Sequence, residues 1–496
     1  MKNKMKHSVL ITMLLMIATL FVTALTVPSV QASASDNSLQ QIKQKGYIVM
    51  GTAPDYPPYE FIGKDNGGSK VYGADIELGK AIAKDLGVKL KVKSMGFDSL
   101  LVALQTKKVD MVIAGMNETP ERAKSVDFSK TYYSSGLSLV LNSADDKKIK
   151  SYKDLQGKTI GAQIGSVQYD AVKKGIKNIN LKGMENINDL ILALKSEKIK
   201  AIPLDTAVAQ AYAAHNPGLK IIDAKMPGQE SQNKIAFFKG ATSLENAANN
   251  TIDKVNKDNL YTKKFVPAAA KHITNNKSQS QFETMWQYKN FFISGIEYTM
   301  IISVVSVFFG IILGVIFALM RLSHNWLLHS IAVCYIEFIR GTPQLVQIMF
   351  IYFGLGTIVN VPALTSGIIA ISINSGAYVA EIIRGGINSI SDGQSEAALS
   401  LGLSKKQSMQ YIVLPQAFKN IWPALGNELV TLIKDSSLAS VIGVGELMYQ
   451  MRAVQADTYL GVAPIAVIMI IYFVITFTIS RIMKHLEGKI SHGTND

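Results

Sequence analysis

The chain divides into two halves that differ in their pattern of hydrophobic and polar positions. From Gly46 to residue 222, short β-rich runs (YIVMGTA, LKVKSM, VDMVIAG) alternate with amphipathic stretches (ADIELGKAIAKDLG, FDSLLVALQTKK). Strands that alternate with helices predict an α/β fold with a largely parallel sheet. One set ends near residue 115 and a second occupies 151–222, and stretches near 132–141 and 229–240 would link them. We therefore expect two α/β lobes over 36–270, with a cleft that closes about a hinge.

The second half, 285–490, is apolar and sparsely charged, and predicts an all-α transmembrane domain of about five helices. Each apolar segment is near the roughly 20 residues that a helical span requires. The segments lie at about 291–320, 331–358, 363–383, 427–446 and 460–481. A polar stretch, KHITNNKSQSQFE, separates the halves and has no apolar periodicity. We expect a flexible linker there, over 271–284.

The N-terminus predicts export of the first half. Basic residues precede an apolar core from Val9 to Val27, and small residues follow at Ala32 and Ala34. This order is typical of a signal peptide, here 1–34, although the core is long enough to remain as an uncleaved anchor. With the lobes outside the cell, five spans place the C-terminus in the cytoplasm.

Charge distribution agrees with this topology. The loop 385–425 then lies inside, and so do the turn Arg321–His324 and the basic C-terminal tail, as the positive-inside rule requires. The lysines of that loop are Lys405, Lys406 and Lys419. We therefore expect a multi-pass protein of the cell membrane, with its binding domain on the extracellular side and the segment EAALSLGLSKKQSMQYIVLP (396–415) in the cytoplasm.

Composition excludes several classes of function. The formal charge of +14 comes from lysines scattered along amphipathic segments, without the clustered aromatic residues of a nucleic-acid interface. The single cysteine, Cys334, lies in an apolar run, which excludes intrachain disulfides and thiolate metal sites. Gly157–Lys158–Thr159 is not a phosphate-binding loop, because Tyr152 stands where that motif needs glycine. We expect no catalytic residue, metal site or cofactor on this chain.

The first half resembles the polar amino-acid family of bacterial extracellular solute-binding proteins over roughly 45–270. The resemblance rests on blocks in the family's order: GTAPDYPPYEF, GADIELGKAIAKDLG, VDMVIAGMNETPERAKSVDFSKTYY, DLQGKTIGAQIGSVQYD and AIPLD. It implies a two-lobed, periplasmic-binding-protein-like fold of type II and an amino-acid ligand. Such a zwitterion needs a fork-shaped cation for its carboxylate and an anion for its ammonium, because desolvation is otherwise not offset.

Those needs and the resemblance together give a set of candidate ligand-binding residues. Arg122 is the expected partner of the ligand's carboxylate and Asp205 that of its ammonium. A surface ion pair for Arg122 and a helix N-cap for Asp205 are the alternatives. The resemblance adds the turn at Gly115 and Asn117, the loop at Ser166 and Val167, and the rings of Tyr56 and Phe97.

The ligand's side chain stays open between glutamine and the basic amino acids arginine, lysine and histidine. Glutamine-binding relatives place an acid where this chain has Ala53, and Asn117 replaces a more usual serine or threonine. Asp55, Glu60 and Glu118 would suit a cationic side chain if they faced the cleft.

The second half resembles the polar amino-acid permeases of bacterial ABC importers. The blocks that carry this resemblance are EFIRGTPQLVQ, NSGAYVAEIIRGGINSI, LIKDSSLASVIGVGEL and the EAA loop at 396–415. In that loop Gly402 permits a sharp turn and Pro415 is expected to end the hydrogen-bonded run. The resemblance implies docking of a separate ABC ATP-binding subunit, which carries ATP and Mg. The expected coupling residues are Glu396, Ala397, Ala398, Gly402, Leu414 and Pro415.

Charges inside the membrane are functional candidates. We expect Arg340, Glu381 and Arg384 either to line a transmembrane substrate path or to pair with one another and hold helices together. Since five spans form half a pathway in this family, the resemblance also implies a permease homodimer.

These observations predict the binding and permease subunit of an ATP-driven importer of polar amino acids. An amino-acid-gated channel or sensor on the same binding fold is the alternative, and an enzyme is another. A channel would need a filter loop and has no use for the EAA loop, and a sensor would need a kinase-like tail after 490. An enzyme would need a cleft acid or base that the ligand's zwitterion does not occupy.

Overall fold

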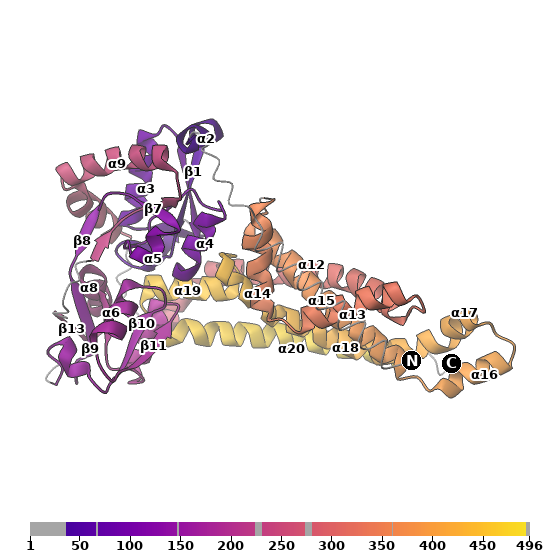
Figure 1. Cartoon of the computed structure of the whole chain (residues 1–496). Coiled ribbons are helices and arrows are strands. Elements are labelled where there is room, and N and C mark those ends of the chain that lie inside the picture. The colour runs from indigo at the N-terminus through magenta and orange to yellow at the C-terminus, as the bar shows by residue number, and fades with distance from the viewer. Residues whose placement is uncertain are drawn as a thin grey trace.

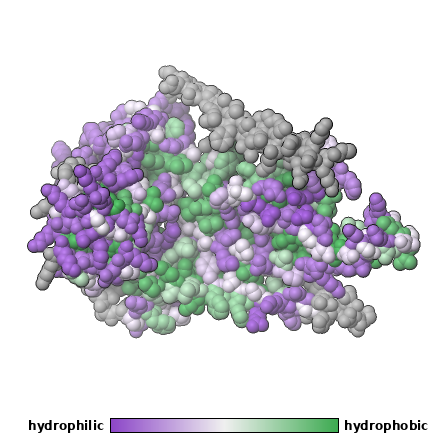
Figure 2. Space-filling model, turned by 60° about the horizontal axis from the view of Figure 1, so that its bottom comes forward, coloured by the Kyte–Doolittle hydropathy of each residue, from purple (hydrophilic) through white to green (hydrophobic). Residues whose placement is uncertain are grey.

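The computed structural model describes residues 36–65, 68–145, 148–223, 231–272, 280–359 and 361–492. The expected signal peptide and the central part of the expected linker, 273–279, lie outside these residues. Figure 1 shows two α/β lobes at one end of an elongated half that is built of helices. The surface over the lobes is mainly hydrophilic, and hydrophobic residues gather over the helical half (Figure 2).

The first lobe is built on a five-stranded sheet in the order β5-β1-β6-β15-β7. β1 (Tyr47–Thr52) pairs in parallel with β5 (Lys89–Ser94) and β6 (Met111–Val112). β15 (Ala236–Phe238) returns antiparallel between β6 and β7 (Val126–Phe128). A smaller antiparallel sheet joins β2 (Asp55–Tyr56), β3 (Glu60–Asp65) and β4 (Gly68–Tyr72). The α-helices are α2 (Ser38–Lys45), α3 (Ala74–Asp85), α4 (Leu100–Gln105), α5 (Pro120–Ala123), α9 (Thr242–Lys257) and α10 (Val266–Ala270).

The second lobe follows the same alternation of strands and helices. β9 (Leu137–Asn142) lies between β12 (Ile202–Asp205) and β13 (Leu219–Asp223), and both pair with it antiparallel. β10 (Thr159–Gln163) and β11 (Asn180–Met184) form a parallel pair beside them. The helices are α6 (Val167–Gly175), α7 (Ile187–Lys195) and α8 (Thr206–His215).

Two short strands connect the lobes. β8 (Tyr133–Ser135) carries the chain from the first lobe to the second, and β14 (Ser231–Asn233) leads back. The two pair antiparallel, from Ser231 with Ser135 to Asn233 with Tyr133. This confirms the linking stretches that the sequence predicts near 132–141 and 229–240.

The second half contains three helices that are long and apolar enough to cross a membrane, among the residues that the structure describes. They are α12 (Lys289–Leu322), α15 (Ala363–Asn388) and most of α20 (Val462–His492). The apolar window of α20 is only 11% buried, so most of its surface is available to lipid. The other α-helices are α11 (Gln281–Gln287), α13 (Trp326–Arg340), α14 (Gln344–Met349), α16 (Asp392–Ser400), α17 (Lys405–Gln407), α18 (Leu414–Asp435) and α19 (Leu447–Thr458).

The prediction of one continuous span over 331–358 is wrong. Helix α13 ends at Arg340 and α14 begins at Gln344, because Pro343 has no N–H with which to continue the helical ladder. Backbone carbonyls freed at such a break need donors inside a membrane. The side chain of Gln347 supplies them, since its Nε2 donates to the carbonyls of Ile339 at 2.7 Å and Thr342 at 3.1 Å.

The prediction of a span over 427–446 is also wrong. The helix lies earlier, as α18, and the chain then tightens into a 3-10 helix, Ser436–Ile442, that ends at Gly443. Gly443 has a φ of +81°, and a Cβ there would lie 2.1 Å from the carbonyl oxygen of Ser94 in the first lobe. The last residues of the expected span therefore lie against the first lobe and do not form part of a membrane-spanning helix.

Pro415 does not end the hydrogen-bonded run, contrary to the prediction. It lies in the first turn of α18, which continues a helical stretch from Lys405. A π-helical segment, Ser408–Val413, comes immediately before it. Proline has no N–H for the carbonyl four residues earlier, and a wider turn accommodates that loss without a break.

The lobes pack directly on the helical half. Lys108 of the first lobe is buried and its Nζ donates to the carbonyl of Val361 at 3.2 Å. On the second lobe, His215 stacks on Tyr459 of the helical half with ring centroids 4.3 Å apart. Apolar side chains from the first lobe and from the helical half also share one buried cluster, which includes Met95, Leu100, Tyr352 and Ile442. Each lobe thus has its own contact with the helices.

Candidate functional site

A small cavity lies between the lobes, and seven of the eight predicted ligand residues line it: Tyr56, Phe97, Gly115, Asn117, Arg122, Ser166 and Val167. The remaining lining residues are Ala53, Asp55, Glu60, Ala114, Gln163 and Gln168. Both lobes contribute, so opening the cleft would expose the cavity. Interlobe hydrogen bonds hold it closed. In two of them the hydroxyl of Tyr212 donates to the carbonyl of Asp55 at 2.9 Å, and the N–H of Asp205 donates to the Tyr56 hydroxyl at 3.3 Å.

One end of the cavity is cationic. Thr119 caps the short helix α5 and so fixes Arg122, whose guanidinium lies 5.6 Å from the centroid of the Phe97 ring. Its two terminal nitrogens donate to the carbonyls of Asn117 and Gly165, one in each lobe. Burial lowers the pKa of Arg122 to about 10, so the guanidinium remains charged at neutral pH. A guanidinium has five N–H donors, and the others are available to a bound carboxylate.

The N-terminus of α6 lies at the same end. Ser166 is its N-cap, and the Ser166 hydroxyl accepts from the N–H of Tyr169 at 3.1 Å and donates to the carbonyl of Gln163 at 2.7 Å. The first N–H groups of a helix have no partner within the helix, and the helix dipole favours an anion there. Arg122 and α6 together therefore form an end suited to a carboxylate.

The turn at Gly115 shapes the cavity wall. Gly115 has a φ of +53°, which favours glycine, and a Cβ there would come within 3.3 Å of the Tyr56 ring. Its N–H donates to Asp75 at 2.9 Å. Asn117 is held beside it, because its Nδ2 donates to the carbonyl of Gly115 at 3.3 Å. This turn therefore holds backbone close to the cavity in a fixed geometry.

The other end of the cavity is acidic. Glu60 is fully buried, and the one hydrogen-bond partner of its carboxyl group among the described residues is the carboxyl group of Asp75. Burial, and then the neighbouring Asp75, raise the pKa of Glu60 well above its usual value. Asp55 accepts from the N–H of Ile187 at 3.0 Å, and burial raises the pKa of Asp55 to about 6. Among the described residues, neither carboxyl group forms an ion pair within 4.0 Å, and Arg452 acts on Asp55 only from a greater distance. Glu118 instead forms an ion pair with Lys234 at 2.7 Å and lies outside the cavity.

Asp205 does not line the cavity, contrary to the prediction, but lies directly behind Gln168, which does. Its carboxylate accepts from Gln168, which lines the cavity, at 2.9 Å and from Ser231 at 3.1 Å. Asp205 occupies the N-cap position of α8, but its side chain forms no capping bond. Burial raises the pKa of Asp205 to about 7. An ammonium group that displaced the Gln168 amide would therefore meet a buried carboxylate.

A second candidate site lies at the other end of the molecule, where α16 and α17 project beyond the long helices (Figure 1). Glu396, Ala397 and Ala398 lie on α16, and the chain then turns at Gly402, whose φ is +86°. Pro415 and Leu414 begin α18, which packs next to this loop. Several apolar side chains of the loop are exposed, among them Leu401 (84%), Tyr411 (61%), Leu414 (43%) and Leu399 (42%). Such exposure marks a contact surface.

The charges predicted inside the membrane form one cluster around Glu381. Arg384 reaches the Glu381 carboxylate in two bonds of 3.0 Å. Arg340 lies 3.6 Å from the same carboxylate, and Arg321 lies 3.3 Å from it. The arrangement favours the pairing alternative, because it ties α12, α13 and α15 together; a substrate path through these residues stays a prediction.

Comparison with known proteins separates the two halves in the same way. Residues 48–267 match the bacterial extracellular solute-binding proteins, family 3, and residues 310–492 match the binding-protein-dependent transport system inner membrane component. The arginine transport system permease protein ArtQ of Bacillus subtilis (strain 168) is 41% identical over 202 residues, which are 40% of this chain and 92% of ArtQ. The chain belongs to these two families. It is a solute-binding protein fused to the permease of an amino-acid ABC importer.

Two further relatives represent its two halves. The arginine-binding extracellular protein ArtP of the same Bacillus strain is 39% identical over 232 residues, which are 46% of the fused importer subunit and 86% of ArtP. The glutamine transport system permease protein GlnP of Escherichia coli (strain K12) is 37% identical over 215 residues, or 43% of this chain and 98% of GlnP. The fused importer subunit is therefore a membrane transport protein.

Sequence reasoning missed some lining residues of this importer subunit. Gln163 ends β10 and lines the cavity, and nothing in its local pattern marks it. Glu60 begins a strand and has apolar neighbours on both sides. An acidic residue in such a position is a candidate for a buried functional group, because acids are rarely buried without a partner. The sequence did not decide which face of that strand meets the cleft.

Proposed function

We propose that the importer subunit selects arginine or a closely similar cationic amino acid, with glutamine as the alternative. The observation that carries this choice is the buried carboxyl group of Glu60 in the wall of the cavity, which among the described residues is bonded to another acid, Asp75, and to no cation, with Asp55 beside the same space. A buried carboxylate without a cation is unfavourable, and a planar guanidinium can pair with it through two parallel hydrogen bonds. The amide of glutamine would leave that charge without a partner.

The ligand's backbone would occupy the cationic end. Its carboxylate meets Arg122 and the N-terminus of α6, framed by Gly115, Asn117, Ser166 and Val167. Its ammonium replaces the Gln168 amide on Asp205, and the rings of Tyr56 and Phe97 flank the aliphatic stem. A bound arginine then carries one positive charge more than glutamine into a cavity whose lining acids outnumber its single arginine.

The relatives support both candidates. ArtP and ArtQ are described as arginine-binding and arginine-transporting, and GlnP as glutamine-transporting. The acidic end of this cavity favours the arginine alternative.

Transport would use a separate ABC ATPase subunit with ATP and Mg. The exposed apolar side chains of the 396–415 loop are the proposed docking surface, and Glu396, Ala397, Ala398, Gly402, Leu414 and Pro415 belong to it. The loop and the lobes lie at opposite ends of the helices (Figure 1), which supports lobes outside the cell and the loop inside. Two copies of the permease half would form the pathway.

Thermal unfolding of residues 36–272 in the presence of each of the twenty amino acids tests the substrate. Arginine at about 100 times its Kd contributes about 2.7 kcal/mol of stability, which raises the Tm of a domain this size by about 5–10 °C. Lysine should give a smaller shift and glutamine a smaller one still. A shift for glutamine equal to that for arginine would contradict the choice, and no shift with any amino acid would contradict the ligand class.

A Gly402→Asp variant of the full chain tests the coupling loop. A residue with a Cβ is strained at a φ of +86°. We expect this variant to lose the ATPase subunit during co-purification and to lose uptake, while its lobes still bind arginine. Gly385→Ala is the matched control, because a Cβ there meets open space within a regular helix. Retained uptake by Gly402→Asp would remove the coupling role.

A further inference from the structure

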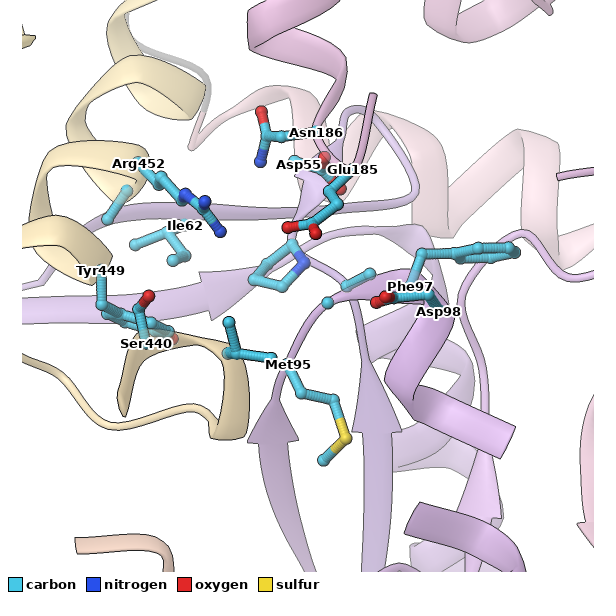
Figure 3. A pocket seen from close by; sticks show the side chains of 15 residues that line it. Asp55, Ile62, Met95, Phe97, Asp98, Glu185, Asn186, Ser440, Tyr449 and Arg452 are labelled. Atoms are coloured by element: carbon cyan, nitrogen blue, oxygen red, sulfur yellow. The ribbon is translucent and has the colours of Figure 1, made fainter. Parts of the chain in front are cut away.

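A second cavity lies between the mouth of the cleft and the permease half (Figure 3). Asp55, Phe97 and Asp98 of the first lobe line it, and so do Glu185 and Asn186 of the second lobe. Its floor comes from the permease, where Ser440, Tyr449 and Arg452 line it. The space therefore has walls from all three bodies that must move during transport.

This second cavity adjoins the ligand cavity. Ala53, Asp55 and Phe97 line both. Phe97 also lies against Arg122, which holds the cationic end of the ligand cavity. When the lobes part, both cavities widen together, because each has walls in both lobes. The second cavity therefore lies between the ligand cavity and the permease half.

Arg452 is the only basic residue among the side chains that line the second cavity. It extends from α19 into the cavity, on the side opposite Asp55 and Glu185 (Figure 3). Among the described residues it has no ion-pair partner within 4.0 Å. Asp55 and Asp189 of the lobes and Glu446 of the permease half are within its electrostatic reach. A half-buried guanidinium without a direct partner is available to an anion.

We propose that the second cavity is a transfer site, in which Arg452 takes over the α-carboxylate of the amino acid from Arg122 as the lobes open. Asp55, Asp98 and Glu185 supply the anionic wall that a cationic ligand needs on its other side. The site thus repeats the charge pattern of the ligand cavity, with a guanidinium facing carboxylates. This inference rests on the proposed amino-acid import, and makes Arg452 a substrate-contacting residue of the permease half.

The transfer site explains why an arginine is placed at a docking interface without an ion pair. A residue that served only docking would gain from a direct partner across the interface, as Lys108 of the first lobe has in the carbonyl of Val361 of the permease half. Once the ligand's carboxylate has left Arg122, it needs another cation before the ligand enters the membrane half. Arg452 would supply that cation between the two.

The test compares Arg452→Gln with the unchanged full chain, each co-purified with its ATPase subunit and reconstituted in liposomes. Losing a charge-assisted bond should slow arginine uptake by about tenfold or more. Arginine binding, measured by titration calorimetry, and arginine-stimulated ATP hydrolysis should each remain within about twofold of the unchanged chain. Arg452→Lys, which keeps the charge, should restore part of the uptake.

The matched control is Lys64→Met, which removes a cation from the same interface outside both cavities. Lys64 Nζ donates to Gln287 at 3.0 Å and lies 3.9 Å from the Tyr288 ring centroid, so it links a lobe to the permease half. We expect uptake and stimulated hydrolysis to fall together in this variant. Arg452→Gln would overturn the transfer site if it behaved in the same way or transported at the normal rate. Absence of arginine binding in the unchanged chain would instead contradict the proposed substrate.

Discussion

Buried acids in the lobes and in the membrane half differ in their partners. In the ligand cavity, the described residues offer Glu60 only the carboxyl group of Asp75 and offer Asp55 only backbone N–H groups as hydrogen-bond partners. In the membrane half, Glu381 is surrounded by Arg321, Arg340 and Arg384 within 4 Å. Glu60 and Asp55 are buried and Glu381 is partly buried, but only Glu381 already has beside it the cations that offset the desolvation.

The difference suggests how to separate structural charges from functional ones in this protein. An ion pair that is complete within the chain holds helices together and leaves nothing for a ligand. A carboxyl group that is buried, unpartnered and next to a cavity marks a place where the missing charge arrives with the substrate. By this criterion we interpret the Glu381 cluster as structural, and we propose that Glu60, Asp55 and Arg452 belong to the transport path.

Arg122→Ala should have the largest effect of the changes that test this contrast. Truncation leaves the ligand's carboxylate buried with only the N-terminus of α6, which lowers arginine affinity by at least about a hundredfold. Titration calorimetry on residues 36–272 measures the loss. Arg122→Lys is the control and should keep part of the affinity, because it keeps the charge but not the fork. Undiminished binding by Arg122→Ala would remove this residue from the site.

Glu381→Gln should destabilise the permease half, because it leaves three arginines facing one another. Glu381 is 16% exposed, but Arg340 and Arg384 are about one third exposed, so solvent screens part of the repulsion. We expect a loss of about 1–3 kcal/mol in the free energy of unfolding. Thermal unfolding of the full chain in detergent measures it. A transporter of unchanged stability that no longer moved arginine would assign Glu381 to the substrate path instead.

The affinity for arginine should also depend on pH, and this effect should be smaller than that of Arg122→Ala. The pKa of Asp205 in the empty cavity is about 7 and that of Asp55 about 6. A bound cation favours the ionised carboxylates and lowers both pKa values, so binding releases protons. Affinity should therefore rise as the pH rises from 5 to about 7 and level off above that, by up to about tenfold per pH unit for each proton released.

The stability of the empty domain should show the opposite trend, because the raised pKa values of Asp205 and Asp55 make their contribution fall as the pH rises. The pKa of Asp205 is raised from 3.8 to about 7 on folding, so its contribution to stability is present below pH 3.8 and is lost as the pH rises through 7. Calorimetric titrations between pH 5 and pH 8, with thermal unfolding of the empty domain alongside, measure both trends. An affinity that did not change over this range would mean that neither acid meets the ligand's cations.

The sequence predicts the arrangement of the lobes well, because strands and helices alternate in short, regular runs. It predicts the residues of the cationic end through family blocks such as AGMNETPER, and seven of the eight candidates line one cavity. The sequence does not predict that Glu60 faces the cavity. The direction of its side chain depends on how β2, β3 and β4 pair, and this pairing is not evident from the local pattern.

The membrane half is predicted less well, for a physical reason. Apolar length alone hides the break at Pro343, because the carbonyls that the break frees are satisfied by Gln347, a side chain four residues later. The helix expected over 427–446 ends at Asp435, and a lobe lies against Gly443 a few residues later, a long-range contact that the local pattern does not show. Arg452 lies in a short helix that does not span the membrane. Its candidate role becomes visible only from its position in a cavity between the two lobes and the permease half.

The most direct test of the central claim is the effect of Glu60→Gln on the ratio of the arginine and glutamine affinities of residues 36–272. If Glu60 awaits the ligand's cation, removing its charge should weaken arginine binding by about ten- to a hundredfold and change glutamine binding by less than about threefold. The stability of the empty domain should change little, because the raised pKa of Glu60 already leaves this group uncharged when no ligand is bound. An unchanged affinity ratio would show that Glu60 does not read the substrate's side chain, and the contrast between unpartnered and paired acids would no longer identify the site.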